Sequence, residues 1–276
     1  MQLGIFARTF TRPTLAEIFD AVVAHELHCV QFNMACVGLP SLPDQIEKDV
    51  IARIHVEAAS RKINIAAVSG TYNMIHPDLM QRQAGLRRLR VLATACKHMG
   101  TSVITLCTGT RDPENMWRWH PENTSPQAWE DLLSAMDAAL HIAEEEGIIL
   151  AFEPERANVI NTAARGRALL DAMRSQHLKV IMDPANLIVP GNKQHMHNVL
   201  DEAFELLGEH VVLAHAKDID PDYTFQAAGS GILDYDYYLH HLATAAVEVP
   251  LIIHGLSEEQ VDDAVQFLRD KLKGKR

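Results

Sequence analysis

The sequence predicts an α/β fold, a single-domain (β/α)₈ barrel over residues 1–276. Two observations carry this prediction. Eight short apolar runs alternate with stretches of helical periodicity, and parallel strands need crossover connections of this kind. No G-x-G-x-x-G motif follows the first run, as it does in a dinucleotide-binding open sheet. The length of 276 residues is also typical of one closed barrel.

The apolar runs are expected to form the strands. Each is rich in Val, Ile, Leu or Phe and is short enough to be a strand buried on both faces. The runs are Leu3–Ala7, Cys29–Asn33, Ile63–Ser69, Ser102–Cys107, Ile148–Glu153, Val180–Asp183, Val211–His215 and Pro250–His254.

The stretches between the runs have the spacing of amphipathic helices. Apolar side chains recur at i, i+3, i+4, i+7 and i+11, which places them on one stripe that faces a sheet. Two such stripes are Trp129, Leu132, Leu133, Met136 and Leu140, and Val261, Ala264, Val265, Leu268 and Leu272.

Capping residues mark where these helices begin and end. Thr14 with Glu17 fits a capping box, and Ser125 before Pro126 fits an N-cap followed by proline at the first helical position. Gly147 stands between a helical stretch and the next strand, where a left-handed residue is wanted.

Composition limits the classes of partner. The formal net charge of −11 disfavours nucleic acid and anionic membrane surfaces, which would repel the chain. Four scattered cysteines without a C-x-x-C pair indicate reduced thiols. No signal peptide is visible at the N-terminus, and no run approaches the roughly 18 apolar residues of a membrane span. We therefore expect a cytoplasmic protein.

Four of the predicted strands end in a potential metal ligand. These are Glu153, Asp183, His215 and His254, separated by 30, 32 and 39 residues, each about one strand–helix unit. In a barrel such side chains converge on the mouth at the carboxyl ends of the strands. Two carboxylates with two imidazoles suit Mn²⁺, Fe²⁺, Co²⁺ or Zn²⁺ better than Ca²⁺. Each residue also has a structural alternative, such as an ion pair or a turn cap.

The segments around three of these ligands resemble the sugar phosphate isomerase/epimerase (xylose isomerase-like TIM barrel) superfamily. This superfamily includes ketose 3-epimerases, inosose dehydratase and 3-dehydroshikimate dehydratase. The resemblance covers nearly the whole chain. It extends to Asn73-Met74-Ile75-His76-Pro77, Thr105-Leu106-Cys107-Thr108-Gly109, His215-Ala216-Lys217-Asp218 and Gly229-Ser230-Gly231-Ile232-Leu233-Asp234-Tyr235.

The resemblance implies a metal site with one departure. The family's ligands are Glu, Asp, His and Glu from strands five to eight, and the first three correspond to Glu153, Asp183 and His215. His254 stands where the family has its second Glu. The epimerases use the two glutamates as opposed acid and base, which requires a group of suitable pKa on each face. With His254, either an imidazole takes that role or the reaction is an elimination.

Other residues near the strand ends are expected to contact substrate. Asn186 stands where the epimerases often have a His. Glu155 is a second candidate acid or base, and Lys217 is a candidate partner for a substrate hydroxyl or carboxylate, or for Asp218. His76 follows the third strand, where a loop imidazole has no obvious core role.

The loop from Arg111 to Pro126 contains two tryptophans and a histidine. Trp117 is expected either to stack on a sugar-like ring or to lie in a homo-oligomer interface.

These expectations combine into a metal-dependent enzyme of carbohydrate metabolism that acts on a small sugar-like molecule. The first interpretation is an isomerase or epimerase of a ketose-type sugar, with Glu153 as base and His254 or Glu155 as partner acid. The alternative is a dehydratase or lyase of a keto-sugar or cyclitol. Mn²⁺ is the first choice of metal, before Mg²⁺, Co²⁺, Fe²⁺ or Zn²⁺. Two further alternatives are a non-catalytic binding barrel and a phosphodiesterase resembling endonuclease IV, which the acidic charge and the few ligands disfavour.

Overall fold

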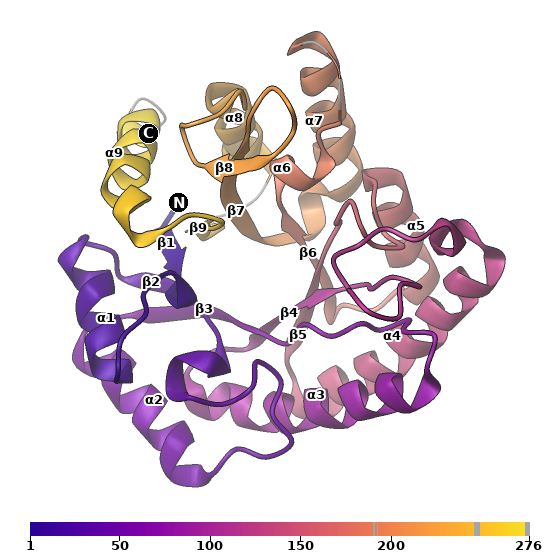
Figure 1. Ribbon diagram of the computed structural model, residues 1–276, viewed down its shortest axis with the longest axis horizontal. Coiled ribbons are helices and arrows are strands. Elements are labelled where there is room, and N and C mark those ends of the chain that lie inside the picture. The colour runs from indigo at the N-terminus through magenta and orange to yellow at the C-terminus, as the bar shows by residue number, and fades with distance from the viewer. Residues whose placement is uncertain (190, 192, 246–248, 274–276) are drawn as a thin grey trace.

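Eight parallel strands close into a barrel in the computed structural model, which describes residues 1–189, 191, 193–245 and 249–273 (Figure 1). Each strand pairs with the next along the chain, and pairing of the first with the last completes the ring. The predicted fold is therefore confirmed. The strands are β1 (Leu3–Phe6), β2 (Cys29–Phe32), β3 (Asn64–Ser69), β4 (Val103–Cys107), β5 (Ile149–Glu153), β6 (Leu178–Met182), β7 (Val211–Ile219) and β9 (Leu251–Ile253).

Helices surround the strands as an outer ring (Figure 1). Over the described residues, none is long and apolar enough to cross a membrane. The α-helices are α1 (Leu15–Ala24), α2 (Lys48–Ser60), α3 (Leu79–Met99), α4 (Pro126–Glu146), α5 (Ala163–Met173), α6 (Pro184–Leu187), α7 (Lys193–Leu207), α8 (Tyr235–Ala245) and α9 (Val261–Lys273). Short 3₁₀ turns lie at Ala7–Thr9, Met34–Val37, Pro121–Thr124, Gly208–His210 and Glu258–Gln260.

The predicted helix ends are present. The Thr14 side chain accepts from the backbone N–H of Glu17 at 3.3 Å, and Glu17 accepts from the backbone N–H of Thr14 at 3.0 Å. Ser125 begins α4 by accepting from the N–H of Ala128 at 3.1 Å. Gly147 ends α4 with φ of +61°, a conformation that favours glycine.

The seventh strand differs from its prediction. β7 continues four residues beyond His215 and forms an antiparallel hairpin with β8 (Phe225–Ala227), in which Ile219 pairs with Phe225. The sequence did not predict β8 because three residues, Phe-Gln-Ala, are too few to show alternation. β8 pairs only with the extended end of β7 and is not a strand of the barrel ring.

An apolar layer fills the centre of the barrel beneath the carboxyl ends of the strands. Its members are fully or almost fully buried and come from six strands: Cys29, Ala67, Ala151, Ile181, Leu213 and Ile252. Side chains two positions apart on a strand point to the same face. The next inward positions therefore form a second layer above the first: Gln31, Ser69, Glu153, Asp183, His215 and His254.

All four cysteines are buried free thiols, as the sequence indicated. Burial raises the pKa of Cys29 to about 12, of Cys36 to about 11 and of Cys96 to about 12. Since the thiolate is the reactive form, the native protein is expected not to react rapidly with a disulfide reagent at pH 8. Counting reactive thiols before and after denaturation tests this, and a fast native reaction would contradict it.

Candidate metal centre at the strand ends

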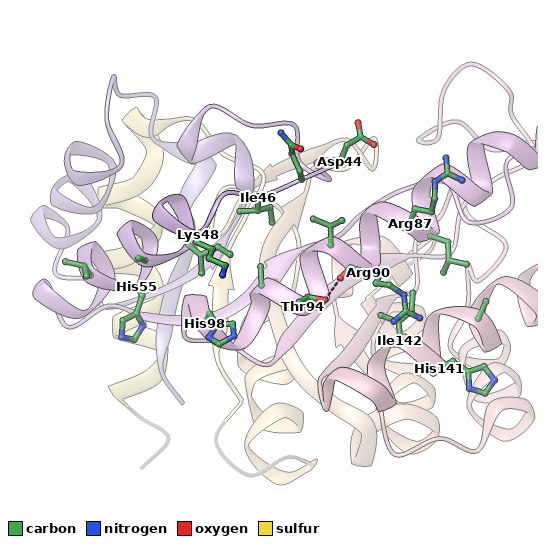
Figure 2. Close-up of a pocket in the computed structure, with 18 residues that line it drawn as sticks. Asp44, Ile46, Lys48, His55, Arg87, Arg90, Thr94, His98, His141 and Ile142 are labelled. Carbon is green, nitrogen blue, oxygen red and sulfur yellow. Dashed lines mark hydrogen bonds between the residues drawn. The ribbon is translucent and has the colours of Figure 1, made fainter.

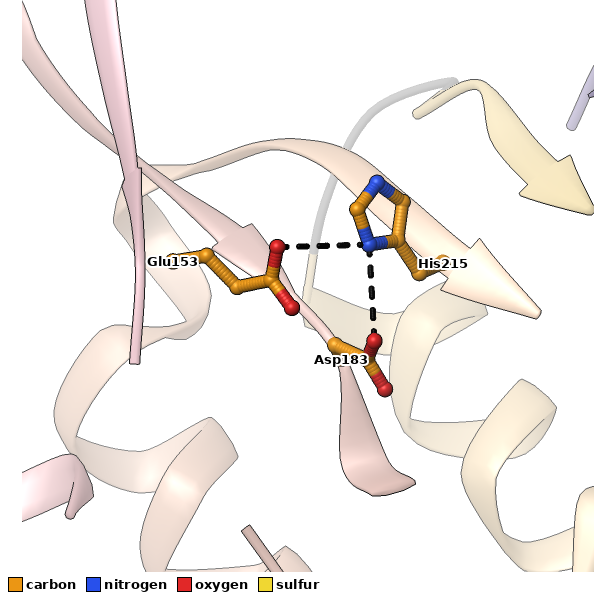
Figure 3. A group of neighbouring side chains, drawn as sticks. All are labelled: Glu153, Asp183 and His215. Atoms are coloured by element: carbon orange, nitrogen blue, oxygen red, sulfur yellow. Dashed lines mark ion pairs between the residues drawn. The ribbon is translucent and has the colours of Figure 1, made fainter. Parts of the chain in front are cut away.

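Three side chains of the upper layer point their donor atoms at one another (Figure 3). Glu153 ends β5, Asp183 follows β6 as the N-cap of α6, and His215 lies in the middle of β7. Nδ1 of His215 lies 3.5 Å from Glu153 Oε2 and 3.5 Å from Asp183 Oδ2. One ligand atom of each residue lies within 4.8 Å of the other two.

The bonding of this group fits a cation at its centre. Nδ1 of His215 is buried and has no hydrogen-bond partner among the described residues, and Oδ2 of Asp183, also buried, faces the ammonium of Lys217. Buried polar atoms are rarely left unpaired, because each costs about 1–3 kcal/mol. Two carboxylate oxygens and one imidazole nitrogen are also a donor set that divalent metals accept. Glu153, Asp183 and His215 can therefore hold a metal ion.

Charge within the triad leads to the same conclusion. Burial alone would lower the pKa of His215, but Glu153 and Asp183 outweigh it and raise this pKa to about 9. The two carboxylates thus favour positive charge at Nδ1. A divalent metal at this position would compete with that proton, so metal affinity should fall as the pH is lowered.

Gln31 and Ser69 orient the imidazole from the other side of the barrel, a role that the sequence analysis missed. Gln31 Oε1 accepts from Nε2–H of His215 at 2.9 Å, and Gln31 Nε2 donates to the Ser69 hydroxyl at 3.2 Å. Gln31 and Ser69 are each 4% exposed. Because the amide oxygen can only accept, Nε2 keeps its proton, and Nδ1 is the ring nitrogen that faces the candidate metal position.

Replacing Gln31 with Leu is expected to weaken metal binding about 10- to 100-fold, the usual effect of losing such a partner. Gln31→Glu keeps the acceptor and should retain most of the affinity. Competition with a chromogenic chelator measures both variants. Equal affinity of Gln31→Leu and wild type would show that the amide does not orient His215.

Asn186 connects the triad to a second carboxylate. Its amide Nδ2 donates to Glu153 Oε1 and, at 2.8 Å, to Glu155 Oε2. Burial, and then the charge of Glu153, raises the pKa of Glu155 to about 7. Glu153 at the end of β5 and Glu155 therefore lie side by side, and the raised pKa of Glu155 suits it to hold a proton near pH 7, as an acid requires.

His254 lies beside the triad and outside the group of converging atoms. Its ring stacks on that of His215 with centroids 4.9 Å apart and an interplanar angle of 12°. Burial, followed by the charges of His215 and Lys217, lowers the pKa of His254 to about 3, so the imidazole is neutral near pH 7. Its Nδ1 is buried and has no partner among the described residues. The roles of His254 as ligand and acid stay predictions.

Lys217 reaches the triad from β7, two residues after His215. Its ammonium Nζ lies 3.1 Å from Asp183 Oδ2, and the residue is 5% exposed. Burial opposes its charge, but Asp183, Glu153 and Glu155 outweigh burial and raise the pKa of Lys217. A permanent positive charge therefore lies at the edge of the candidate metal position.

The remaining predicted contacts lie elsewhere in the loops. His76 uses both ring nitrogens on backbone: Nε2 lies 3.1 Å from the carbonyl oxygen of Pro113, and Nδ1 accepts from Asp78 N–H at 3.0 Å. The contact with Pro113, in the loop after β4, has no pattern in the sequence. Trp117 is 57% exposed. Their roles in substrate binding stay predictions.

A separate hollow of about 1310 Å³ lies on the outside of the barrel among α2, α3 and α4 (Figure 2). Its walls include Ile51, Val91 and Ile142, with His55, Arg90 and other polar side chains along the edges. Neither the triad nor any other predicted site residue lines it. This hollow is therefore separate from the candidate metal position.

The fold and the donor set define a parallel barrel whose strand ends can bind a metal. The chain belongs to the xylose isomerase-like TIM barrel family, whose model matches residues 19–271. No curated protein sequence matches the chain significantly.

Solved structures share the fold at low sequence identity. The 3-keto-D-glucoside 4-epimerase YcjR from E. coli is 17% identical with a TM-score of 0.72, covering 98% of this chain and 99% of its own. The IOLI protein with a bound zinc atom is 13% identical with a TM-score of 0.75, covering 99% and 97%. The probable 3-DHS dehydratase AsbF from Bacillus anthracis is 11% identical with a TM-score of 0.75, covering 98% and 99%.

Proposed function

We propose that this chain is a metal-dependent isomerase or epimerase of a small ketose-type sugar or sugar derivative. The observation that carries the proposal is the convergence of Glu153, Asp183 and His215, whose buried Nδ1 has no hydrogen-bond partner among the described residues. A divalent ion held there would polarise a carbonyl oxygen and acidify the adjacent C–H. Mn²⁺ is our first choice, and the zinc in the IOLI structure makes Zn²⁺ an alternative.

Two carboxyl groups of the protein, Glu153 and Glu155, carry out the proton transfers. Glu153 takes the proton from the carbon beside the carbonyl, and Glu155, with its raised pKa, returns a proton to the adjacent atom. Asn186 holds both carboxylates in place through its amide. Both groups follow the same strand, which favours transfer on one face of the substrate. A neutral His254 is poorly suited to be the opposed acid of a two-sided inversion, and its catalytic role stays a prediction.

Elimination of water is the second candidate. It is favoured by His254 at the position of the family's second glutamate, because an epimerase needs an acid or base on that face and a dehydratase does not. In this case Glu153 removes the proton and protonated Glu155 gives its proton to the departing hydroxyl. The dehydratase name of the AsbF structure adds support.

Metal analysis and solvent-deuterium exchange test both candidates. Purified protein reconstituted with Mn²⁺, Zn²⁺ or Co²⁺ is analysed for bound metal and incubated in D₂O with ketoses, keto-glycosides and keto-cyclitols. Deuterium incorporation with an isomeric product supports isomerisation, and loss of water with an unsaturated product supports elimination. Absence of stoichiometric metal under all conditions would overturn the proposal.

A further inference from the structure

Two cations share one aromatic ring at the mouth of the barrel. Lys217 Nζ lies 3.8 Å from the centre of the Phe225 ring, and the guanidinium carbon of Arg156 lies 4.5 Å from the same centre. Arg156 comes three residues after Glu153, whereas Phe225 comes from the β7–β8 hairpin. Phe225 is 42% exposed, so the hairpin presents a large apolar side chain beside each of the two cations.

The Arg156 guanidinium uses few of its N–H donors within the described part of the chain. Its one hydrogen bond within the described part of the chain goes to the carbonyl oxygen of Tyr223 at 3.2 Å, and no described carboxylate lies within ion-pair distance of it. A guanidinium has five N–H donors, arranged as a fork that matches a carboxylate or phosphate. The residue is only partly exposed, in a chain of net charge −11 that offers many carboxylates. A partly buried arginine without an acidic partner is suited to an acidic ligand.

The balance of charge at the mouth also favours an anion. Glu153 and Asp183 are balanced by Lys217 and Arg156. With a divalent ion in the triad and Glu155 ionised, these groups together would carry one surplus positive charge. In a partly buried site such a surplus attracts a negatively charged group.

We propose that Arg156 and Lys217 form an anion subsite that holds a carboxylate or phosphate group of the substrate, with Phe225 packing against both cations. The inference rests on the proposed function, since it assumes that the reacting carbon lies at the triad. It narrows the substrate class to acidic sugars: sugar acids or sugar phosphates.

Binding of three matched polyols without a carbonyl tests the subsite. Glucitol is neutral, gluconate carries a carboxylate, and glucitol 6-phosphate carries a phosphate. Calorimetry at constant ionic strength is run on protein loaded stoichiometrically with Mn²⁺. We expect at least one anion to bind about tenfold or more tightly than glucitol, as a charge-assisted pair implies. The tighter of the two anions identifies the acidic group.

Variants separate the subsite from general electrostatics. Arg156→Gln should remove most of the anion preference and leave glucitol binding unchanged. Arg174→Gln makes the same charge change on an exposed residue between α5 and β6, at the opposite end of the barrel, and should behave as wild type. An equal effect of the two variants, or equal binding of glucitol and both anions by wild type, would overturn the inference.

Metal content, measured on the same samples, distinguishes failure of the anion subsite from failure of the proposed function. Protein that retains Mn²⁺ but shows no anion preference contradicts the subsite alone. Protein that retains none of Mn²⁺, Zn²⁺ and Co²⁺ contradicts the proposed function, and the preference is then read on the metal-free protein, where the Arg156→Gln comparison still applies.

Discussion

Glu153→Gln is expected to lower the rate of substrate deuterium exchange by about 10²- to 10⁴-fold, the usual contribution of a general base. The amide keeps the size of the side chain but cannot accept the proton, and it is a poorer metal ligand than a carboxylate. Exchange measured by mass spectrometry in D₂O, together with bound metal, separates the two effects. A variant that keeps its metal and loses exchange has lost the base.

Glu202→Gln is the matched control for this substitution. Glu202 is exposed on α7, away from the strand ends, and its replacement by Gln removes one negative charge, as Glu153→Gln does. It should exchange deuterium as wild type does. If Glu153→Gln also retained the wild-type rate, Glu153 would not be the base, and Glu155 would become the leading candidate.

Leu213→Ala is expected to reduce the free energy of unfolding by about 2–5 kcal/mol. Leu213 is fully buried in the apolar layer at the centre of the barrel, where it pairs with Ile181 of β6. The surrounding strands are hydrogen-bonded into a closed ring, so they cannot collapse readily to fill the cavity. Urea denaturation monitored by circular dichroism measures the loss.

Val56→Ala serves as the control for the core substitution. Val56 lies on α2 and is 60% exposed, so its truncation should change the free energy of unfolding by no more than about 0.5 kcal/mol. A similar small change for Leu213→Ala would mean that the centre of the barrel repacks around the missing methyl groups.

Most of the fold could be predicted from sequence because each strand is a continuous apolar run. The predicted strands overlap all eight barrel strands, and most boundaries agree within two residues. Two differences have local causes. β6 begins at Leu178, before the apolar run, since Lys179 shares the strand. β8 was missed because its pairing depends on the fold of the β7 hairpin and not on its own pattern.

The site was predictable where a charged residue interrupts an apolar strand end. Glu153, Asp183 and His215 stand out in this way, and the structure brings them together. Gln31 and Ser69 are neutral and do not stand out, although each also lies two positions after an inward apolar residue. The alternation of inward-facing and outward-facing side chains, followed along every strand, predicts both positions. The contacts of Lys217 and Arg156 with Phe225 depend on the hairpin and leave no pattern in sequence.

The hydrogen bond between Gln31 and His215 has a consequence for folding kinetics. It joins positions 184 residues apart, one in the first quarter of the chain and one in the last. Contacts of such long range form late, because the entropy of closing the loop opposes them until the rest of the ring is in place. The complete candidate metal centre should therefore arise only with barrel closure. A metal added during refolding would stabilise the finished protein by mass action without accelerating its formation.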